Sequence, residues 1–559
     1  MTRSVVDSFP ELVTSAASAG TIQALRLAIP AAAAWVAAAF AVGWSASTGL
    51  RAGVGSGILA VAAWGAFGRY AGRHRGGLDA PPVVWLSVVQ RIVVAALVCA
   101  SGAFFAVAWR VAAISNSPVA RLAAVHQTAY VDLRIDSDPQ PLVGRDGRVR
   151  AAFAATVLRV DDEVGPGAFR LHVPVFVVAR DPGWFTVQPS QRVRATAHLS
   201  PARERALEAA VADVRGPPTI QSGVVWWQAL AGAVRRGVQR AARSLPAGPR
   251  GLLPGIVDGD TTQLAPDVQA DFATTGMTHL VAVSGTNLAI FLGAWLGLLR
   301  RLTYRRRWHL LFGVMGILAF VVVARPQPSV LRAGAMGLIA LLGSTIGSRL
   351  SALAVLSAAS LLLIYANPAL ARSYGFALSV IATASLLVGA PPLSRWMGRR
   401  IPAWLAAATA VPLAAALGCA PLIVSFTGRV SVFTVPANLL AEAAVGPATI
   451  LGILTGAVAV VWPWAGSVVA HLAGIPCAWI IWVAHFFARL PGATMRWPSG
   501  FGGALSLAVV EASAVLAIRG LAARRRRRTG KPRTGPLADA RFATPALTGS
   551  IARDWPVSD

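Results

Sequence analysis

The chain has 559 residues, of which 55% are hydrophobic and 13% are charged, and its mean hydropathy is +0.60. Soluble globular proteins carry about 25% charged residues, so this composition excludes an ordinary soluble protein and predicts a polytopic α-helical membrane protein. The formal net charge of +28 is explained first by arginines in cytoplasmic loops beside anionic lipid; a polyanionic substrate is compatible with it but not required by it.

Three apolar segments come first, near residues 22–42, 54–67 and 83–111, and each is about long enough to cross a bilayer. The arginines of the RYAGRHR loop between the second and third segments predict a cytoplasmic loop. We therefore expect a three-helix transmembrane segment over residues 1–114, with the N-terminus inside and the chain outside after about Ser115.

Residues 115–222 have the composition of a soluble domain. Residues 130–135 alternate apolar with charged side chains, which predicts a β-strand, and similar runs recur near 152–160, 169–178 and 192–199 between Gly-rich turns. Short strands separated by such turns suggest a small β-barrel outside the membrane.

Residues 223–250 contain an amphipathic helix, expected from Val224 to Leu245, with paired Trp226 and Trp227 near its start. Tryptophans suit a membrane interface. This helix either lies along the outer leaflet and joins the barrel to the membrane domain, or packs on the barrel as a surface helix.

The segment from Gly251 to Gly293 passes from polar to apolar while it keeps hydrophilic side chains. Pro266 and Asp267 predict the start of a short helix and Gly276 its end, and a second helix is expected from about Met277 to about Leu299. Hydrocarbon offers no hydrogen-bond partners, so polar groups here need a bundle interior or a water-filled path. The candidate channel-lining residues of this segment are Asp260, Asp271, His279, Ser284, Gly285, Thr286 and Asn287.

Arginines between 300 and 307 predict a cytoplasmic loop, and further spans are expected near 310–323, 330–346, 352–366, 374–390 and 403–426. Residues 432–462 are too long for one plain helix and contain Pro436 and Pro447, so we expect a broken or re-entrant helix followed by one span. Its Asn438 and Glu442 join the candidate channel-lining residues. Spans near 465–487 and 502–521 bring the total to about 12 transmembrane helices with both termini cytoplasmic, and residues 523–559 predict a basic, disordered tail.

Several ordered motifs resemble one family. GDT from Gly259, DFATTGMTHL from Asp271 and HLVAVSG from His279 are similar to the signature of ComEC-type competence proteins, the inner-membrane DNA-uptake channels of naturally transformable bacteria. The resemblance continues with VLRAGAMGLIALLG from Val330, ANPALARSYGFALSVIAT from Ala366 and PLIVSFTGRVSVFTVPANLLAE from Pro421. The sequence departs from the family pattern at Asn287, where members more often carry a histidine.

This resemblance implies a competence transmembrane channel domain over residues 251–522 and an OB-like fold for the extracytoplasmic β-barrel of residues 115–222. OB-like barrels often bind single strands through basic grooves and aromatic side chains. The candidate DNA-binding residues are Arg145, Arg148, Arg150, Phe153, Arg159, Arg170 and Trp184. The alternative is that they are solvated surface charges and core aromatics, because Asp132, Asp136, Asp161, Asp162 and Glu163 offset much of the charge.

The function implied by the resemblance is conduction of single-stranded DNA across the cytoplasmic membrane during natural transformation. The implied partners are single-stranded DNA, membrane lipid, a competence DNA receptor, a separate nuclease, and a cytoplasmic translocase or single-strand-binding protein; a homo-oligomer stays open. The alternative function is a secondary transporter or exporter of a small anionic metabolite, since transporters also use discontinuous helices.

An enzyme is not expected. Ser284 with a histidine from another helix, such as His309, His471 or His485, would suit an intramembrane protease, but Ser-Gly pairs are common in membrane helices. The HxHxDH metal ligands of the nuclease domain found in many ComEC relatives do not occur, and all three cysteines fall in apolar stretches. We therefore predict no catalytic residues, no metal and no cofactor.

Overall fold

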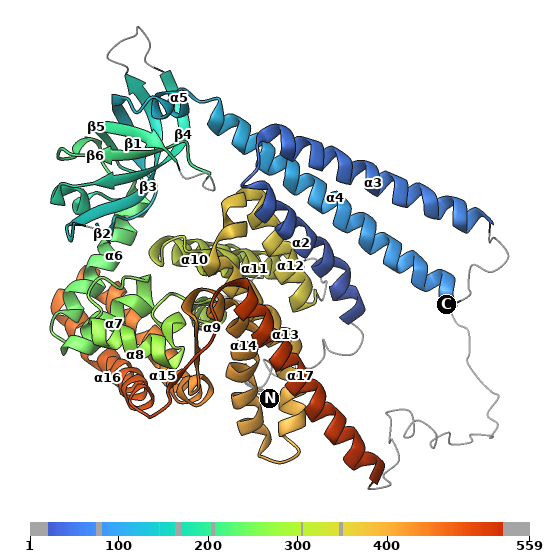
Figure 1. Cartoon of the computed structure of the whole chain (residues 1–559). Coiled ribbons are helices and arrows are strands. Elements are labelled where there is room, and N and C mark those ends of the chain that lie inside the picture. The colour runs from blue at the N-terminus through green and yellow to red at the C-terminus, as the bar shows by residue number, and fades with distance from the viewer. Residues whose placement is uncertain are drawn as a thin grey trace, which may run out of the picture.

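The structure is a computed structural model that describes residues 21–73, 81–144, 146–161, 169–202, 207–302, 306–345 and 350–528. A small β domain lies to one side of a large helical assembly (Figure 1). Arg145, residues 74–80 and the tail from residue 529 onward lie outside the described residues, and of the predicted cytoplasmic loop RYAGRHR (residues 69–75) the structure describes residues 69–73, which are helical.

The three N-terminal helices are confirmed as α2 (Thr21–Ala41), α3 (Ala46–Arg73) and α4 (Pro81–Ser115). Helices α3 and α4 pair as a long hairpin, and α4 also packs against α2 (Figure 1). Helix α2 packs against α12 (Ala352–Ala366) and the 3₁₀ turn η3 (Pro368–Arg372) that follows it, and the Trp35 indole donates to the Ala371 carbonyl of η3 at 2.8 Å. The Tyr365 hydroxyl donates to the Cys99 carbonyl of α4 at 2.7 Å. These bonds attach the N-terminal helices to the C-terminal half.

Short helix α5 (Pro118–Ala124) leads into the β domain. Its strands are β1 (Thr128–Ile135), β2 (Gln140–Val143), β3 (Val149–Asp161), β4 (Phe169–Ala179), β5 (Arg192–Pro201), β6 (Ala210–Val214) and β7 (Thr219–Ser222). The order β1-β3-β4-β6-β5 closes because β5 also pairs with β1, and only β4–β6 is a parallel pair. The four predicted strands and the small barrel are confirmed.

The barrel core follows from the alternation of apolar and polar side chains along each strand. On β1, Val131, Leu133 and Ile135 are all buried. Phe153 and Trp184 stack inside at a ring-centroid distance of 5.5 Å, and the Trp184 indole donates to the Gly216 carbonyl at 2.9 Å. Their exposures of 2% and 0% contradict the prediction that these two rings stack on bases: they are core aromatics.

The amphipathic helix is α6 (Trp226–Ala242), and α7 (Ala247–Asp258) follows it. It joins the barrel to the helical domain, but its buried face packs against α15 (Thr434–Val461), α16 (Pro463–Ala488) and α7. A Cβ on Gly237 would lie 3.4 Å from the Gly456 carbonyl, so small residues let α6 and α15 come close. The predicted alternative of a helix packed on the barrel is therefore wrong. Trp226 and Leu230 stay exposed near its start.

The remaining helices are α8 (Pro266–Thr275), the 3₁₀ turn η2 (Thr278–Leu280), α9 (Gly285–Leu302), α10 (Arg306–Val323), α11 (Pro328–Thr345), η3 (Pro368–Arg372), α13 (Tyr374–Met397), α14 (Ala403–Thr427) and α17 (Gly500–Arg528). Within the described residues, seven helices are long and apolar enough to cross a membrane, and four shorter apolar helices accompany them. The predicted class, a multi-pass helical membrane protein with an inserted small barrel, is confirmed.

The predicted break in residues 432–462 is wrong, because α15 is one continuous helix of 28 residues. Pro436 lies in its first turn, where a proline removes no helical hydrogen bond, and Pro447 is accommodated inside the helix. Before α15, strand β8 (Arg429–Ser431) pairs with β9 (Thr494–Arg496) in a two-stranded ribbon. The ribbon joins the α14–α15 connection to the α16–α17 connection.

Replacing the buried Trp184 by alanine should destabilise the barrel by about 3–5 kcal/mol, because the change leaves a cavity and an unpaired Gly216 carbonyl. The measurement is limited proteolysis of the full chain, with cleavage expected within residues 128–222. Phe185→Ala is the matched control, since Phe185 lies on the same turn and is exposed. Equal protease resistance of the two variants would contradict this view of the core.

Candidate functional site

Two neighbouring groups of polar residues are candidates for a functional site: one joins the barrel to the helical domain, and the other lies within the helical domain. The first, which we call the junction cluster, consists of Asp138, Arg235, Gln239, Asp258, Asp260 and Arg325. The second, the α9 turn, is the chain from Gly276 to Asn287 between α8 and the first turn of α9.

Arg235 of α6 is the centre of the junction cluster. Its guanidinium donates to the Val323 carbonyl at 2.9 Å and to the neighbouring Val322 carbonyl, both in the last turn of α10. The last carbonyls of a helix have no partner within it, so a buried cation there satisfies and stabilises them. Its Nη1 also contacts Asp138 of the barrel at 3.4 Å, and burial lowers the pKa of Arg235.

Arg325, which follows α10, contacts the same Asp138 carboxylate at 3.0 Å and reaches Asp260 at 4.0 Å. Arg325 has a positive φ of 65°, a conformation that costs energy for a residue with a side chain. Asp138 thus lies between two arginines from different segments, and the barrel is held to the helical domain by their charges.

Asp258 and Asp260 flank Gly259, which ends α7 with a φ of 78°. Burial raises the pKa of Asp258 to about 7, because its side chain is enclosed and its Oδ2 has no hydrogen-bond partner among the described residues. Burial also acts on Asp260, but hydrogen bonds from Thr262 and Gln239, with the nearby Arg325 charge, outweigh it and lower its pKa. The two carboxylates therefore differ in charge near neutral pH.

The α9 turn begins as the sequence predicts and then differs. Helix α8 starts at Pro266 and ends at Gly276, whose φ is 70°. The expected continuous helix from Met277 is instead the single turn η2, followed by an unwound stretch before α9 begins at Gly285. The Ser284 hydroxyl accepts from the Asn287 backbone N–H at 3.3 Å and donates to its Oδ1 at 3.1 Å, so Ser284 caps α9.

Asn287 is buried and holds this turn against α7. Its side-chain amide donates to the Ile256 carbonyl at 3.1 Å. On the other side, the Ser329 hydroxyl of α11 donates to the Val283 carbonyl at 2.9 Å. The polar residues that the sequence singled out at 284 and 287 therefore lie together and fix a break between two helices.

Other residues that were predicted to line the channel do not lie beside Ser284 and Asn287 in the cap of α9. Asp271 of α8 hydrogen-bonds His485 of α16, which ties those helices together. Asn438 is buried, donates to the Thr434 carbonyl at 2.7 Å, and lies one turn from Thr434, which packs against Gly276. His279, Thr286 and Glu442 are exposed on the surface of the chain. Glu442 lies on unbroken α15, so no broken helix places it beside the α9 turn.

The barrel arginines carry less free charge than the sequence suggests. Arg150 pairs with Asp146 at 2.7 Å and Arg159 pairs with Asp161 at 2.8 Å. Arg148 is exposed, whereas Arg170 lies on β4 with its side chain outside the described part of the chain. The described residues therefore show local ion pairs rather than a continuous basic groove.

The histidines considered for a protease do not approach Ser284 within the described residues. His471 bonds to the Ser467 carbonyl and His485 to Asp271, while the Ser284 hydroxyl is used in the cap. The hydrogen bonds of Ser284 are those of a helix cap, not of an activated nucleophile.

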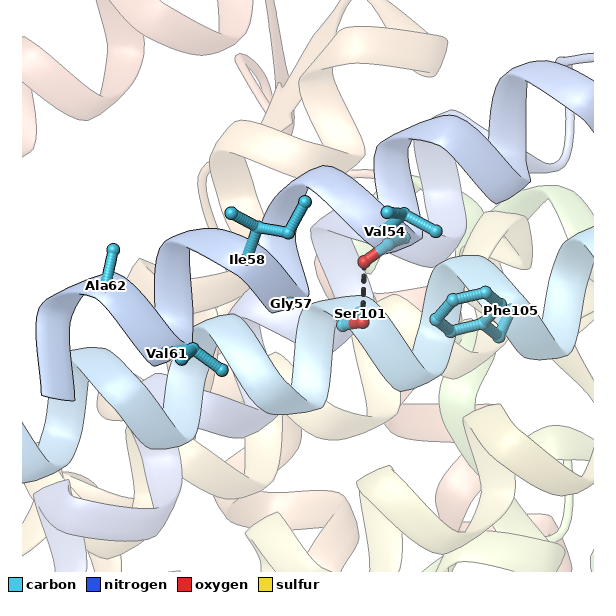
Figure 2. Close-up of a pocket in the computed structure, with 8 residues that line it drawn as sticks. Val54, Gly57, Ile58, Val61, Ala62, Ser101 and Phe105 are labelled. Atoms are coloured by element: carbon cyan, nitrogen blue, oxygen red, sulfur yellow. Dashed lines mark hydrogen bonds between the residues drawn. The ribbon is translucent and has the colours of Figure 1, made fainter. Parts of the chain in front are cut away.

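A hollow of about 530 Å³ lies elsewhere, between α3 and α4 (Figure 2). Its lining is apolar apart from Ser101, whose hydroxyl donates to the Gly53 carbonyl at 2.7 Å. An apolar groove without free polar groups has no means of holding a charged substrate.

The sequence pattern did not single out Arg325, Asp138 or Arg332. Arg332 is buried in α11, where its Nε donates to Ser379 of α13 at 2.8 Å. One signal was present: a lone arginine within the otherwise apolar VLRAGAMGLIALLG stretch.

Comparison with known proteins supports the same region. Residues 256–523, just under half of the chain, match the family model described as "Competence protein". The chain is also 28% identical over 196 residues to "ComE operon protein 3" of Bacillus subtilis (strain 168), a match that covers 35% of this chain and 25% of that relative. The chain thus matches only about a quarter of the relative's length, and no solved structure matches.

The matched residues extend from the end of α7 to α17 and so include the α9 turn, Arg325, Arg332 and both Asp258 and Asp260. Residues 256–523 are therefore similar to the competence-protein family, which confirms the resemblance to ComEC-type proteins that the motifs indicated.

Proposed function

We propose that this protein conducts single-stranded DNA across the cytoplasmic membrane during DNA uptake. The observation that carries the proposal is the α9 turn, an unwound and polar break between helices within the competence-protein domain. Irregular backbone at membrane depth is tolerated only beside protein or a water-filled path, and such breaks serve as substrate sites in transporters.

The junction cluster lies where the strand would enter. It joins the barrel to α6, to the Asp258–Asp260 turn and to the end of α10. In this proposal the barrel faces outward, both termini are cytoplasmic, and the strand passes from the barrel to the α9 turn. Arg148 and the other barrel arginines contribute steering charge at the outer surface.

Moving a polyanion into a cell that is negative inside opposes the membrane potential by about 2.3 kcal/mol per charge per 100 mV. The channel therefore needs partners that trap or pull the strand. We propose a competence DNA receptor outside, a separate nuclease, and a cytoplasmic translocase or single-strand-binding protein.

Glu442 supports either a wet path or a second copy of the chain. It is exposed on α15, a helix apolar enough to span a membrane. A carboxylate facing hydrocarbon is costly, so water or another protein surface must cover this position. A homo-oligomer with Glu442 at its interface satisfies that requirement.

The second candidate, transport of a small anionic metabolite, is favoured by one observation. Helix α9 begins at a break, and the N-termini of broken helices bind anionic groups of small substrates in transporters. Direct uptake measurements separate the two functions.

Deleting the gene should abolish entry of labelled DNA into the source cells, and the wild-type gene should restore it. Asn287→Ala should lower entry at least about 10-fold, because the α9 turn loses its bond to the Ile256 carbonyl. Asn116→Ala, at an exposed position after α4, is the control at equal membrane abundance. Normal DNA entry in the deletion strain would end the channel proposal.

The junction cluster also predicts a pH dependence. The folded-state pKa of Asp258 is raised from 3.8 to about 7, so its contribution to stability is fully present below pH 3.8 and is lost progressively as the pH rises to about 7. Asp258→Asn should therefore be more stable than the parent at pH 8, by a few kcal/mol at most, and this advantage should shrink as the pH falls below about 7 and disappear near pH 3.8.

Asp260→Asn is the matched comparison. The pKa of Asp260 is lowered, so its stabilisation is present above its unfolded pKa, and the variant should be less stable than the parent at pH 8. Thermal unfolding of the full chain in detergent at several pH values measures both. Identical pH profiles for the two variants would contradict the assigned charges.

A further inference from the structure

We propose that Arg332 and the first residues of α9 form a phosphate-binding site that contacts the backbone of the passing strand. This inference rests on the proposed function and identifies which part of DNA is held. Arg332 lies four residues after the start of α11, about 6 Å along that helix, and is 6% exposed.

The charge of Arg332 is uncompensated. Its Nε donates to the Ser379 hydroxyl at 2.8 Å and its Nη1 contacts the Met336 sulfur at 3.1 Å, both neutral groups. Within the described part of the chain, no carboxylate forms an ion pair with it, whereas Arg235 and Arg325 share Asp138. Burying a guanidinium without a counter-ion is unfavourable, so this site is incomplete without an anion.

The third nitrogen of this guanidinium points at the start of α9. A Cβ on Gly285 would lie 2.8 Å from Arg332 Nη2, so only a glycine leaves room for the guanidinium at this place. This close approach gives the Ser284-Gly285 pair a specific role. The cation and the N-terminus of α9 meet at one point.

The backbone there is also suited to an anion. Ser284 caps the N–H of Asn287, but among the described residues the N–H groups of Gly285 and Thr286 have no recorded acceptor. The first N–H groups of an 18-residue helix carry a partial positive charge. A guanidinium beside free N–H groups matches the oxygens of a phosphate.

The site suits a phosphodiester in transit. Conduction requires sites that bind strongly enough to admit a charged group and weakly enough to release it. One arginine and one helix end provide a single phosphate contact, and the unwound stretch before Gly285 lets the strand approach. Free phosphate shares this chemistry, so the test must separate the two.

The test uses the full chain in nanodiscs of zwitterionic lipid. Binding of a fluorescent oligothymidylate is measured by anisotropy over a range of salt concentrations, beside the same oligomer with an uncharged methylphosphonate backbone and beside inorganic phosphate as competitor. For single strands the logarithm of affinity falls with the logarithm of salt by about 0.7 per phosphate contact.

Arg332→Gln should bind the oligothymidylate about 10-fold more weakly and reduce the salt slope by about 0.7. Arg332→Lys should keep the slope. Ser379→Ala removes only the neutral hydrogen-bond partner of the Arg332 Nε and should also keep the salt slope of the parent. A purely structural role of Arg332 would not predict this result. Gly285→Ala, which displaces the guanidinium, should weaken binding if Arg332→Gln does not fold.

If the parent binds DNA and folded Arg332→Gln has the same salt slope as the parent, this inference is wrong. The channel proposal would then be unaffected. If Arg332→Gln loses competition by inorganic phosphate but binds oligothymidylate as the parent does, the site serves a small anion and the inference is wrong. If the parent protein binds the charged and the uncharged oligomer equally well, or binds neither of them, both this inference and the proposed function are wrong.

Discussion

The contact between Arg235 and the end of α10 is the interaction on which the arrangement of barrel and helices depends. The guanidinium satisfies two helix-terminal carbonyls and contacts a carboxylate of the barrel, so one side chain fixes three segments far apart in sequence. Its burial requires all of these partners, because an unpaired cation in this position would be strongly destabilising. Arg325 repeats the contact to Asp138 and extends it to Asp260, which places the α7–α8 turn beneath the barrel.

Helix ends and strands were predictable wherever residues close together in the sequence determine them. Pro266 and Gly276 mark both ends of α8, and the alternating side chains of residues 130–135 gave β1. Long-range choices were not predictable. Closing the barrel requires β5 to pair with both β1 and β6, and nothing in the local pattern encodes these partners. Phe153 on β3 and Trp184 on the 3₁₀ turn after β4 could not be assigned for the same reason, since the side chains that face the core are known only once the neighbours of a segment are known.

The candidate site shows the same division. Ser284 and Asn287 were recognisable as polar residues in an apolar context, and the structure brings them together in one cap. The expected pairing with Glu442 depended on two prolines breaking α15, but tertiary packing keeps that helix whole. The roles of the arginines that complete the polar region could not be predicted, because Arg235, Arg325 and Arg332 are held by individual carbonyls, carboxylates and hydroxyls from segments far away in the sequence.

The ribbon of β8 and β9 has a mechanical consequence. Its backbone bonds clamp the connection before α15 to the connection after α16, while α17 packs along α14. These four helices must consequently tilt as one block, because separating them would break the ribbon. Helices α9, α10 and α11 lie outside this block, and the unwound stretch before Gly285 is where the chain can bend if they move against it.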